Sequence, residues 1–350
     1  MAAKNFCELR LEETPIPEGA VKTATPHRLA SEKVYLPADS AQLLPIPEYL
    51  DRADELRGIL GAVPRLIAGY KPTGSISMNC YLHSLTWLLA LAGWTYTYAA
   101  GDGIILDPDG VAIPTGASRW VFTKRDAIVA QTAQLRLNYA IENLLLTGNG
   151  FGVSQIALGS DGKLAADLVG MFLTQAFADT TTTPSIDSAI IPPVKRGDLF
   201  LTWLTGGGAI QDFSFQIANG LEQIDSMSLD PASYFPDSLE YGDEQVQVTG
   251  SIPKRILNTT DFAALLAATT FAAKARWVTP KVIGATVYKY SAWLEMPSCQ
   301  YVGGSPDALS NKRRKGATYD FFAAYDESAG YDTKITVVND VTSIATWTAT

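Results

Sequence analysis

The chain has 350 residues, of which 47% are hydrophobic and 18% charged, so it can bury a sizeable core and is not typical of a disordered protein. Its 27 Lys and Arg residues against 36 Asp and Glu residues give a net charge of −9. A sequence-independent phosphate binder needs clustered basic residues, so tight nucleic-acid binding is not expected.

The residue types that carry most metal and nucleophile chemistry are few. Cys7, Cys80 and Cys299 lie far apart, without a CxxC pair, which argues against a disulfide scaffold or a zinc ribbon. The chain has only two histidines, His27 and His83, and His83 begins an apolar helical pattern, where a packed or capping role is expected. We therefore expect no metal site, no cofactor and no enzymatic activity. A hydrolase is the least favoured function, because no nucleophile and base motif is present.

The sequence has no segment that predicts membrane insertion. The first residues contain no apolar run, which argues against a signal peptide. The longest apolar run, residues 87–94, is far shorter than the ~20 residues that span a bilayer. Reduced cysteines and the absence of a signal predict a protein made in a cytosol.

Alternating apolar and polar residues predict short β-strands along most of the chain. The pattern is clear at residues 134–138, 212–217, 245–248 and 334–337. Period-two alternation places one face of a strand on a core and exposes the other to solvent. Turns are expected at clusters of Gly, Pro, Asp and Ser, namely residues 107–110, 148–152, 160–163 and 206–208. Asp320, Asp326 and Asp332 are also expected in turns rather than at a calcium site.

Two segments predict α-helices instead. Residues 82–94 place leucines at spacings of three and four on one face. Residues 258–276 begin with Asn258 as a candidate N-cap and Asp261 in the first turn. A third helix is expected at residues 51–60 on a weaker pattern.

An internal repeat connects the two helices. The tetrapeptide Thr-Gly-Ser-Ile precedes each helix, at residues 73–76 and 249–252, with an offset of 250 − 74 = 176. Leu-Leu-Ala recurs at residues 88–90 and 265–267, with an offset of 265 − 88 = 177. About one identical tetrapeptide pair is expected by chance in such a chain, but the repeated strand, loop and helix order predicts a duplication.

The repeat predicts a domain division. Residues 36–40 resemble residues 229–233 with an offset of 229 − 36 = 193, which predicts 193 − 176 = 17 extra residues in the first copy, near residues 45–63. Domain 1 is expected at residues 1–180 with an N-terminal arm. A Thr- and Pro-rich linker follows at residues 181–196, and domain 2 at residues 197–350.

These motifs resemble the tail tube (major tail) proteins of long-tailed, siphovirus-like bacteriophages. The similarity rests on the strand at residues 246–252 followed by Leu265 and Leu266, and on its first copy at residues 73–92. Gly148, Gly150 and residues 160–162 before a closing strand at residues 164–172 add to it. The resemblance implies a mainly β protein with two tandem β-sandwich or barrel domains, each with one flanking α-helix.

The resemblance also implies a structural virion protein that forms rings stacked into a tail tube, a conduit for DNA ejection. Family members with one domain close a ring with six copies. Two tandem domains therefore predict three chains in a pseudo-sixfold ring, and six chains with an outward second domain remain the alternative. The implied partners are further copies of the chain and the tape measure, tail terminator and tail tip proteins. DNA would pass without specific binding, and assembly would take place in the host cytoplasm.

Two sets of residues are candidates for assembly functions. The polar side of two predicted strands is expected to face the lumen, or else to be an ordinary solvated sheet face: Asp212, Ser214, Gln216, Gln245 and Gln247. The basic run is expected to dock on an acidic neighbouring ring, or else to be a solvated loop tip: Lys312, Arg313, Arg314 and Lys315. Ring stacking is expected at residues 4–28, 101–116, 176–196 and 338–350.

A function of another class remains open. Seven Trp and fifteen Tyr residues would also suit a monomeric β-sandwich that binds carbohydrate or a cell surface. Self-assembly would favour the tube, and exposed aromatic residues without self-assembly would favour the binding module.

Overall fold

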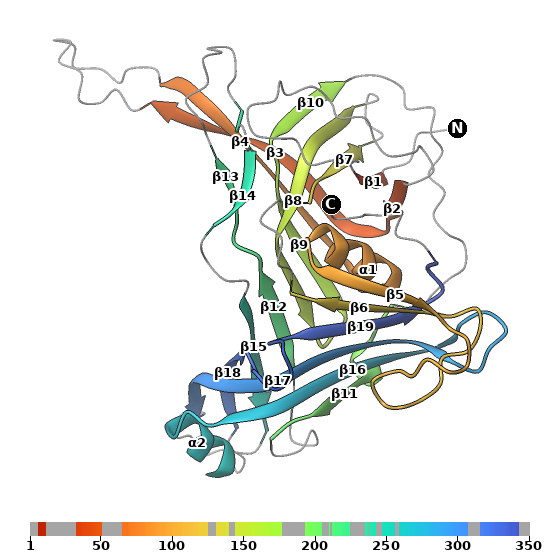
Figure 1. The fold of residues 1–350 in the computed structure, drawn as a ribbon. Helices are drawn as coiled ribbons and strands as arrows, with labels where there is room; N and C mark the ends of the chain where they lie inside the picture. Colours follow the sequence, from red (N-terminus) through yellow and green to blue (C-terminus); the bar gives the residue numbers. More distant parts are fainter. Residues whose placement is uncertain are drawn as a thin grey trace.

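The computed structural model describes residues 6–11, 33–50, 65–124, 131–139, 144–176, 193–204, 210, 212–224, 235–236, 238–242, 247–255, 259–306 and 316–342. These residues form a mainly β protein with two α-helices (Figure 1). The predicted third helix at residues 51–60 lies outside the described residues, as does most of the predicted linker.

Among the described residues, the first half of the chain contains ten strands and the helix α1. Their bounds are β1 (Phe6–Leu11), β2 (Lys33–Leu36), β3 (Ala38–Leu50), β4 (Leu66–Asn79), α1 (Leu82–Leu91), β5 (Thr95–Ala100), β6 (Ser118–Thr123), β7 (Ala133–Asn138), β8 (Leu145–Gly159), β9 (Lys163–Val169) and β10 (Phe172–Ala176).

The described part of the second half contains a short 3₁₀ turn, nine strands and the helix α2. Their bounds are η1 (Arg196–Asp198), β11 (Leu199–Thr202), β12 (Ser214–Ala218), β13 (Leu221–Ile224), β14 (Ser238–Tyr241), β15 (Gln247–Lys254), α2 (Thr259–Leu266), β16 (Thr270–Val282), β17 (Lys289–Pro306), β18 (Ala317–Ala324) and β19 (Lys334–Asn339).

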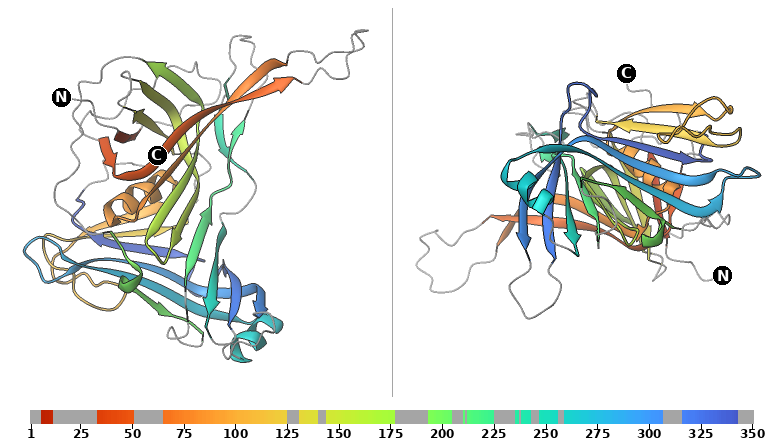
Figure 2. Two further views of the ribbon diagram at one scale, coloured as in Figure 1. Left: turned by 180° about the vertical axis from the view of Figure 1, so that it is seen from behind. Right: turned by 90° about the horizontal axis from the view of Figure 1, so that it is seen from below.

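One antiparallel sheet of eight strands crosses both halves. Its order is β3–β4–β9–β8–β12–β15–β18–β17, with each neighbouring pair hydrogen-bonded. Figure 2 shows it from behind, passing from the orange β3 and β4 to the green β12 and the blue β18. We call this the eight-stranded sheet, and the β8–β12 pairing that joins its halves the internal seam.

Strands β13 and β14 form a separate two-stranded sheet, and the other remaining strands form a second layer in each half. In the first half it is β2–β1–β7–β8–β10, which uses the N-terminal part of β8. In the second half it is β11–β16–β17–β19–β6–β5, which uses the N-terminal part of β17. The β5–β6 hairpin therefore leaves the first half and extends the sheet of the second.

The two halves repeat the same set of strand pairings in the same chain order. The pairings β1–β7, β3–β4, β4–β9, β7–β8, β8–β9 and β8–β10 recur as β11–β16, β12–β15, β15–β18, β16–β17, β17–β18 and β17–β19. Even a β-bulge recurs, at Ser154 opposite β9 and at Val302 opposite β18. Residues at the same place in the repeated pairings are called equivalent below.

The pairing register corrects the upstream sequence match. Gly74 faces Leu43, and the equivalent Gly250 faces Phe215, so β3 and β12 are equivalent with an offset of 215 − 43 = 172 rather than 193. The chain between the paired residues spans 74 − 43 = 31 positions in the first half and 250 − 215 = 35 in the second. The 17 extra residues expected in the first copy are therefore not found in this hairpin.

Two local predictions are wrong. The second helix ends at Leu266, and residues 270–276 belong to β16, because Ala268 adopts a left-handed φ of 49° and Phe271, Ala273 and Ala275 then alternate toward the core. The expected turn at residues 148–152 lies inside the strand β8. There the ring of Phe151 lies against Gly148 and Gly170, where an added Cβ would come within 2.0 and 2.5 Å of it.

The core is continuous between the halves. One cluster of buried side chains includes Leu88 and Leu89 of α1, Trp120 of β6, and Trp293 and Val337 of the second half. The aromatic rings of Phe213, Trp203 and Phe321 pack together within this cluster. Burial on this scale stabilises each large side chain by about 1.5–3 kcal/mol.

Candidate assembly surfaces

The eight-stranded sheet has one polar face turned away from the core. In β4, Ile76 and Met78 are buried while Ser75 and Ser77 on the opposite face remain partly exposed, as the period of two requires. We call this side the wet face. Its partly or fully exposed polar members include Gln42, Thr73, Ser75, Gln155, Ser214, Gln216, Thr249 and Ser251.

Two equivalent carboxylates lie on the wet face. Asp167 of β9 is opposite Ser75, and Asp320 of β18 is opposite the equivalent Ser251. Both aspartates are exposed. Asp320 was expected in a turn because it recurs at six-residue spacing with Asp326 and Asp332, but it lies inside β18. Asp167 was not predicted, since its offset from Asp320, 320 − 167 = 153, differs from the 176 of the Thr-Gly-Ser-Ile repeat.

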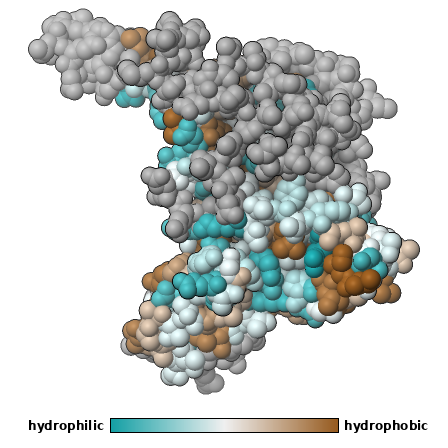
Figure 3. All heavy atoms as spheres, in the orientation of Figure 1, coloured by the Kyte–Doolittle hydropathy of each residue, from teal (hydrophilic) through white to brown (hydrophobic). Residues whose placement is uncertain are grey.

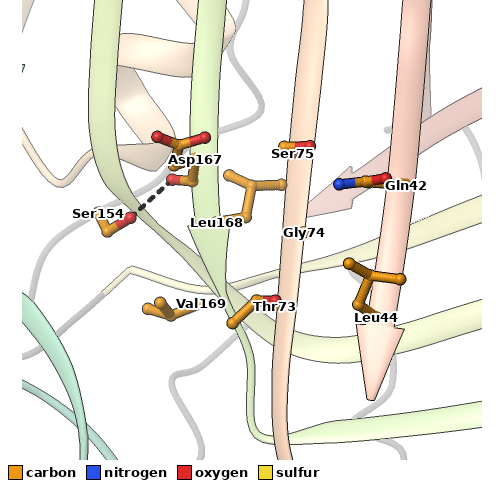
Figure 4. Close-up of a pocket in the computed structure, with 9 residues that line it drawn as sticks. All are labelled: Gln42, Leu44, Thr73, Gly74, Ser75, Ser154, Asp167, Leu168 and Val169. Atoms are coloured by element: carbon orange, nitrogen blue, oxygen red, sulfur yellow. Dashed lines mark hydrogen bonds between the residues drawn. The ribbon is translucent and has the colours of Figure 1, made fainter. Parts of the chain in front are cut away.

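A shallow groove of about 260 Å³ crosses the wet face of the first half (Figure 4). It lies between β3, β4 and β9, with Gln42, Ser75 and Asp167 along it. Ser154 donates a hydrogen bond of 3.0 Å to the carbonyl of Asp167. No cluster of His, Cys, Asp and Glu that would hold a metal ion occurs among the residues that the structure describes.

The residues predicted to face a lumen can now be placed on the sheet. Ser214 and Gln216 of β12 lie on the wet face, and the exposed Gln247 begins β15 on the same side as Thr249. Asp212 precedes β12 and accepts hydrogen bonds from Ser160 and from the amide of Phe213. Gln245 and the basic run Lys312, Arg313, Arg314 and Lys315 lie outside the described residues. Exposure to a lumen stays a prediction for all of them.

The eight-stranded sheet ends in two strand edges that have no partner among the described residues. Along residues 42–46, β3 pairs with β4 alone, and along residues 303–306, β17 pairs with β18 alone. Apolar side chains are exposed beside both edges, namely Leu44 and Ile46 on β3 and Val302 on β17, which is 62% exposed. Unpaired edges with exposed apolar residues are sites of strand addition.

The two helices differ in burial although both follow equivalent strands. Helix α1 packs on β8 of its own half and on β17 and β19 of the second half, and Leu85 and Leu89 are 3% and 0% exposed. Helix α2 packs on β17, the equivalent of β8, and its Phe262 and Leu266 are 41% and 73% exposed.

A buried ion pair attaches α2 to the sheet. Lys254 Nζ at the end of β15 lies 2.7 Å from Asp261 Oδ2, and both side chains are almost fully buried. The hydroxyl of Tyr301 donates to Asp261 Oδ1 at 2.9 Å, and Trp203 Nε1 donates to that hydroxyl at 2.9 Å. Burial lowers the pKa of Lys254, and the hydrogen bond and charge of Asp261 only partly offset this.

The loop between β5 and β6 fastens the first half to the second. Asp109 forms ion pairs with Lys274 at 2.5 Å and Arg276 at 2.9 Å, and it accepts a hydrogen bond of 2.9 Å from Trp293 Nε1. Burial alone would raise the pKa of Asp109, but the hydrogen bonds from Lys274 and Trp293 and the two positive charges outweigh it and lower the pKa. Asp107 accepts a further hydrogen bond from the Tyr288 hydroxyl.

The tip of this loop is apolar and exposed. Ile104 is 79% exposed, and Val287 in the neighbouring turn between β16 and β17 is 95% exposed. Leu106 and Val111 of the same loop are also exposed, and Figure 3 shows a brown area at the lower right of the molecule. An exposed apolar area of this kind marks an interaction surface.

Helix α1 also contacts the last strand of the chain. His83 hydrogen-bonds to Asp340, and the Tyr290 hydroxyl donates to the other oxygen of Asp340 at 2.8 Å. The hydrogen bond with His83 is the main reason why the pKa of Asp340 is lowered. His83 therefore has a structural contact between the halves, in agreement with the packed role predicted for it.

The three cysteines are buried and unpaired. Burial raises the pKa of Cys7, Cys80 and Cys299 to about 12 each. Their thiols are therefore protonated at neutral pH and unreactive.

Fold and surfaces together define a class of protein: a β-sheet subunit with a polar sheet face and open edges, suited to self-assembly. The family model described as phage tail tube protein matches residues 18–321. The chain therefore belongs to this family and is a structural component of a phage tail, as the sequence motifs predicted. A search of curated proteins finds no match. Among the described residues, no helix is long and apolar enough to cross a membrane.

Proposed function

We propose that the chain assembles into closed rings of three copies that stack into the tail tube. Each chain supplies two equivalent halves, so three chains give a ring of six halves with pseudo-sixfold symmetry. The eight-stranded sheets of three chains would then form a wall of 3 × 8 = 24 strands. Heterologous contacts that close on themselves produce such rings.

The internal seam is the observation that carries this proposal. Residues 155–159 of β8 pair in register with residues 214–218 of β12, so the chain already contains one contact between two equivalent halves. A contact of the same kind between chains would continue the sheet in the same direction. This supports a ring in which intrachain and interchain contacts alternate.

The wet face would line the lumen of this ring. Asp167 and Asp320 would then form a circle of six carboxylates, with Ser214, Gln216 and Gln247 among their polar neighbours. Such a wall repels the phosphates of passing DNA over roughly 8–10 Å in physiological salt. Transit without specific binding would follow from this charge.

Stacking of rings would use the surfaces outside the sheet. The apolar tip around Ile104 and Val287 would be buried against the next ring. The basic run Lys312, Arg313, Arg314 and Lys315 would dock on this acidic neighbour. The tape measure, tail terminator and tail tip proteins remain proposed partners through the family.

Electron microscopy of the purified chain, paired with its mass in solution, tests the proposal. Tubes or rings with three chains in each layer are expected as the concentration rises. Ile104→Ser should leave single rings and shorten the tubes, whereas Ser77→Ala on the wet face should not. A persistent monomer in the presence of tail initiation proteins would contradict the proposal, and six chains in each layer would contradict the pseudo-sixfold ring.

The carbohydrate-binding alternative has less support. Exposed aromatic side chains among the described residues are Tyr49, Tyr98, Phe200, Phe262 and Tyr325. They belong to five different elements or loops rather than to one groove or platform. A binding assay on a glycan array would test this function separately.

A further inference from the structure

The internal seam specifies which residues would meet at the open edges of two chains. We infer that residues 43–47 of β3 in one chain pair with residues 302–306 of β17 in a second copy, in the register that β12 and β8 use within the chain. The inference rests on the proposed ring and adds the interface and its register. It uses only the repeated pairings of this chain.

Residue equivalence fixes the register. Leu43 lies opposite Gly74, and Phe215 lies opposite the equivalent Gly250, so residues of β3 and β12 are equivalent at an offset of 215 − 43 = 172. Ile46 is therefore equivalent to Ala218. The shared bulge relates β8 to β17 by 302 − 154 = 148, so Gly303 is equivalent to Gln155. Ala218 pairs with Gln155 in the internal seam. Ile46 of one chain is therefore placed opposite Gly303 of the next.

The exposed side chains at the two open edges also support pairing with a second copy of the chain. Leu44 and Ile46 are exposed at the open edge, whereas the equivalent Gln216 and Ala218 are half-buried by the internal seam. Val302 is exposed, whereas the equivalent Ser154 is half-buried. Leu44 and Ile46 are opposite Thr73 and Lys71 and therefore lie at the margin of the wet face. Pairing with β17 would cover them in part, as the internal seam half-buries Gln216 and Ala218.

Helix α2 supports the interface independently. Helix α1 contacts β17 and β19 across the internal seam. Helix α2 of the second copy would contact the equivalent β8 and β10 of the chain whose β3 pairs with its β17. This contact would cover Phe262 and Leu266, whose equivalents Leu85 and Leu89 are buried.

Prolines reduce the hydrogen bonding of the two open edges in a complementary way. The Gly170 amide donates to the Pro72 carbonyl, so the backbone groups of Pro72 point toward β9 and away from β3. Pro45 lies opposite Pro72 on β3, and its backbone groups therefore point toward the open edge. The Asn219 amide donates to the Ser154 carbonyl, so the backbone groups of Ser154 and of every second residue after it on β8 point toward β12. The backbone groups of the equivalent residues Val302, Gly304 and Pro306 on β17 therefore point toward the open edge.

In the inferred register, each hydrogen-bonded pair contains one proline. The inferred pairs between chains are Leu43 with Pro306, Pro45 with Gly304, and Pro47 with Val302. The equivalent pairs in the internal seam, in the same order, are Phe215 with Leu158, Ile217 with Ile156, and Asn219 with Ser154. Each proline lacks an N–H, so each pair keeps one hydrogen bond of two. Both edges are thus poor partners for unrelated strands but keep one bond in each pair with each other.

Disulfide crosslinking tests the register. The variant with Ile46→Cys and Gly303→Cys should form interchain dimers and closed trimers after assembly and oxidation, seen on a non-reducing gel. An added Cβ at Gly303 would lie 3.2 Å from Asp320 Oδ2, which a small movement of that side chain accommodates. The buried native thiols should not compete.

Matched pairs separate the outcomes. Ala218→Cys with Gln155→Cys should crosslink within one chain before assembly. Ile46→Cys with Val302→Cys is out of register and should give less than a tenth of the interchain product. A second in-register variant, Leu44→Cys with Ser305→Cys, tests the same register if the first variant does not fold. Tubes that form but do not crosslink in register would overturn this inference, whereas failure of the wild-type chain to form rings would overturn the proposed function.

Pro45→Val tests the role of the prolines. The new N–H would add one hydrogen bond at every chain-to-chain contact, so assembly should begin at a concentration about twofold to tenfold lower. Pro37→Ala, which precedes β3 and lies outside the inferred pairing and the proposed stacking surfaces, is the control and should leave that concentration unchanged. An unchanged or higher concentration for Pro45→Val would overturn the inferred pairing of this edge.

Discussion

Helices α1 and α2 follow equivalent strands, yet they are held in different ways. Both halves of the chain cover all the leucines of helix α1. In addition, His83 hydrogen-bonds to Asp340 and Thr86 accepts a hydrogen bond from Asn339. Helix α2 is shorter, exposes Phe262 and Leu266, and is attached through the buried pair of Lys254 and Asp261.

The difference shows what a neighbour contributes to a helix. The equivalent of Lys254 in the first half is Met78, and no ion pair is needed where a second half covers the helix. Among the described residues, helix α2 has no such cover, and a buried ion pair fixes its orientation instead. In the proposed ring, this ion pair would hold α2 in place for contact with a second copy.

The largest effect is expected at the ion pair. Asp261→Ala would leave the Lys254 ammonium buried without this carboxylate, so the free energy of unfolding should fall by about 3–5 kcal/mol. The double variant Lys254→Met with Asp261→Leu should recover most of the loss, because apolar residues of similar size replace buried ion pairs well. Urea denaturation measures both, and a loss under about 1 kcal/mol for Asp261→Ala would show that the pair does not fix α2.

Equivalent leucines on the two helices should respond in opposite ways. Leu89→Ala leaves a cavity in the core and should lower the free energy of unfolding by about 2–5 kcal/mol. Leu266→Ala should change it by less than about 0.5 kcal/mol but raise the concentration needed for assembly. Equal effects of both substitutions on denaturation, with no effect on assembly, would contradict the comparison.

The equivalent glycines provide a test within the sheet. An added Cβ at Gly250 would lie 2.4 Å from the Phe321 ring and 2.2 Å from the Ser214 carbonyl, whereas at Gly74 the nearest atom is 3.2 Å away. Gly250→Ala should therefore lower the free energy of unfolding by about 1–3 kcal/mol, and Gly74→Ala by clearly less. Thermal denaturation of both variants measures the difference, and the reverse order would refute the packing described for β15.

The smallest effect is expected at the loop between β5 and β6. The lowered pKa of Asp109 means that its contribution is present above its unfolded pKa of about 3.9 and is lost as the pH falls through the lower folded value. Asp109→Asn should cost about 1 kcal/mol or less at neutral pH, and its difference from wild type should shrink below about pH 4. Asp320→Asn on the wet face is the control, and a difference that grows in acid would contradict the assignment.

Sequence patterns predicted the main elements because those patterns are local. The Thr-Gly-Ser-Ile repeat placed β4 and β15 and the starts of α1 and α2 correctly. The Ala-rich stretch after Leu266 concealed the end of α2, since alanine fits both helix and strand. The glycines of β8 looked like a turn because the ring of Phe151 that they accommodate cannot be inferred from spacing.

The candidate surfaces were harder to predict because they depend on pairings distant in sequence. Ser214 and Gln216 were placed on a polar strand face from alternation alone. Asp167 and Asp320 became equivalent only through the partner strands of β4 and β15. The open edges of β3 and β17 were not predicted, because an edge is defined by what fails to pair with it.

A reconstruction of the assembled tube that resolves single strands would show how the chains meet in each layer. We expect three chains in each layer, with the β3–β17 contact between chains superimposing on the internal seam and Leu266 covered as Leu89 is. Six chains in each layer, or β3 and β17 edges left open in the wall, would contradict this arrangement.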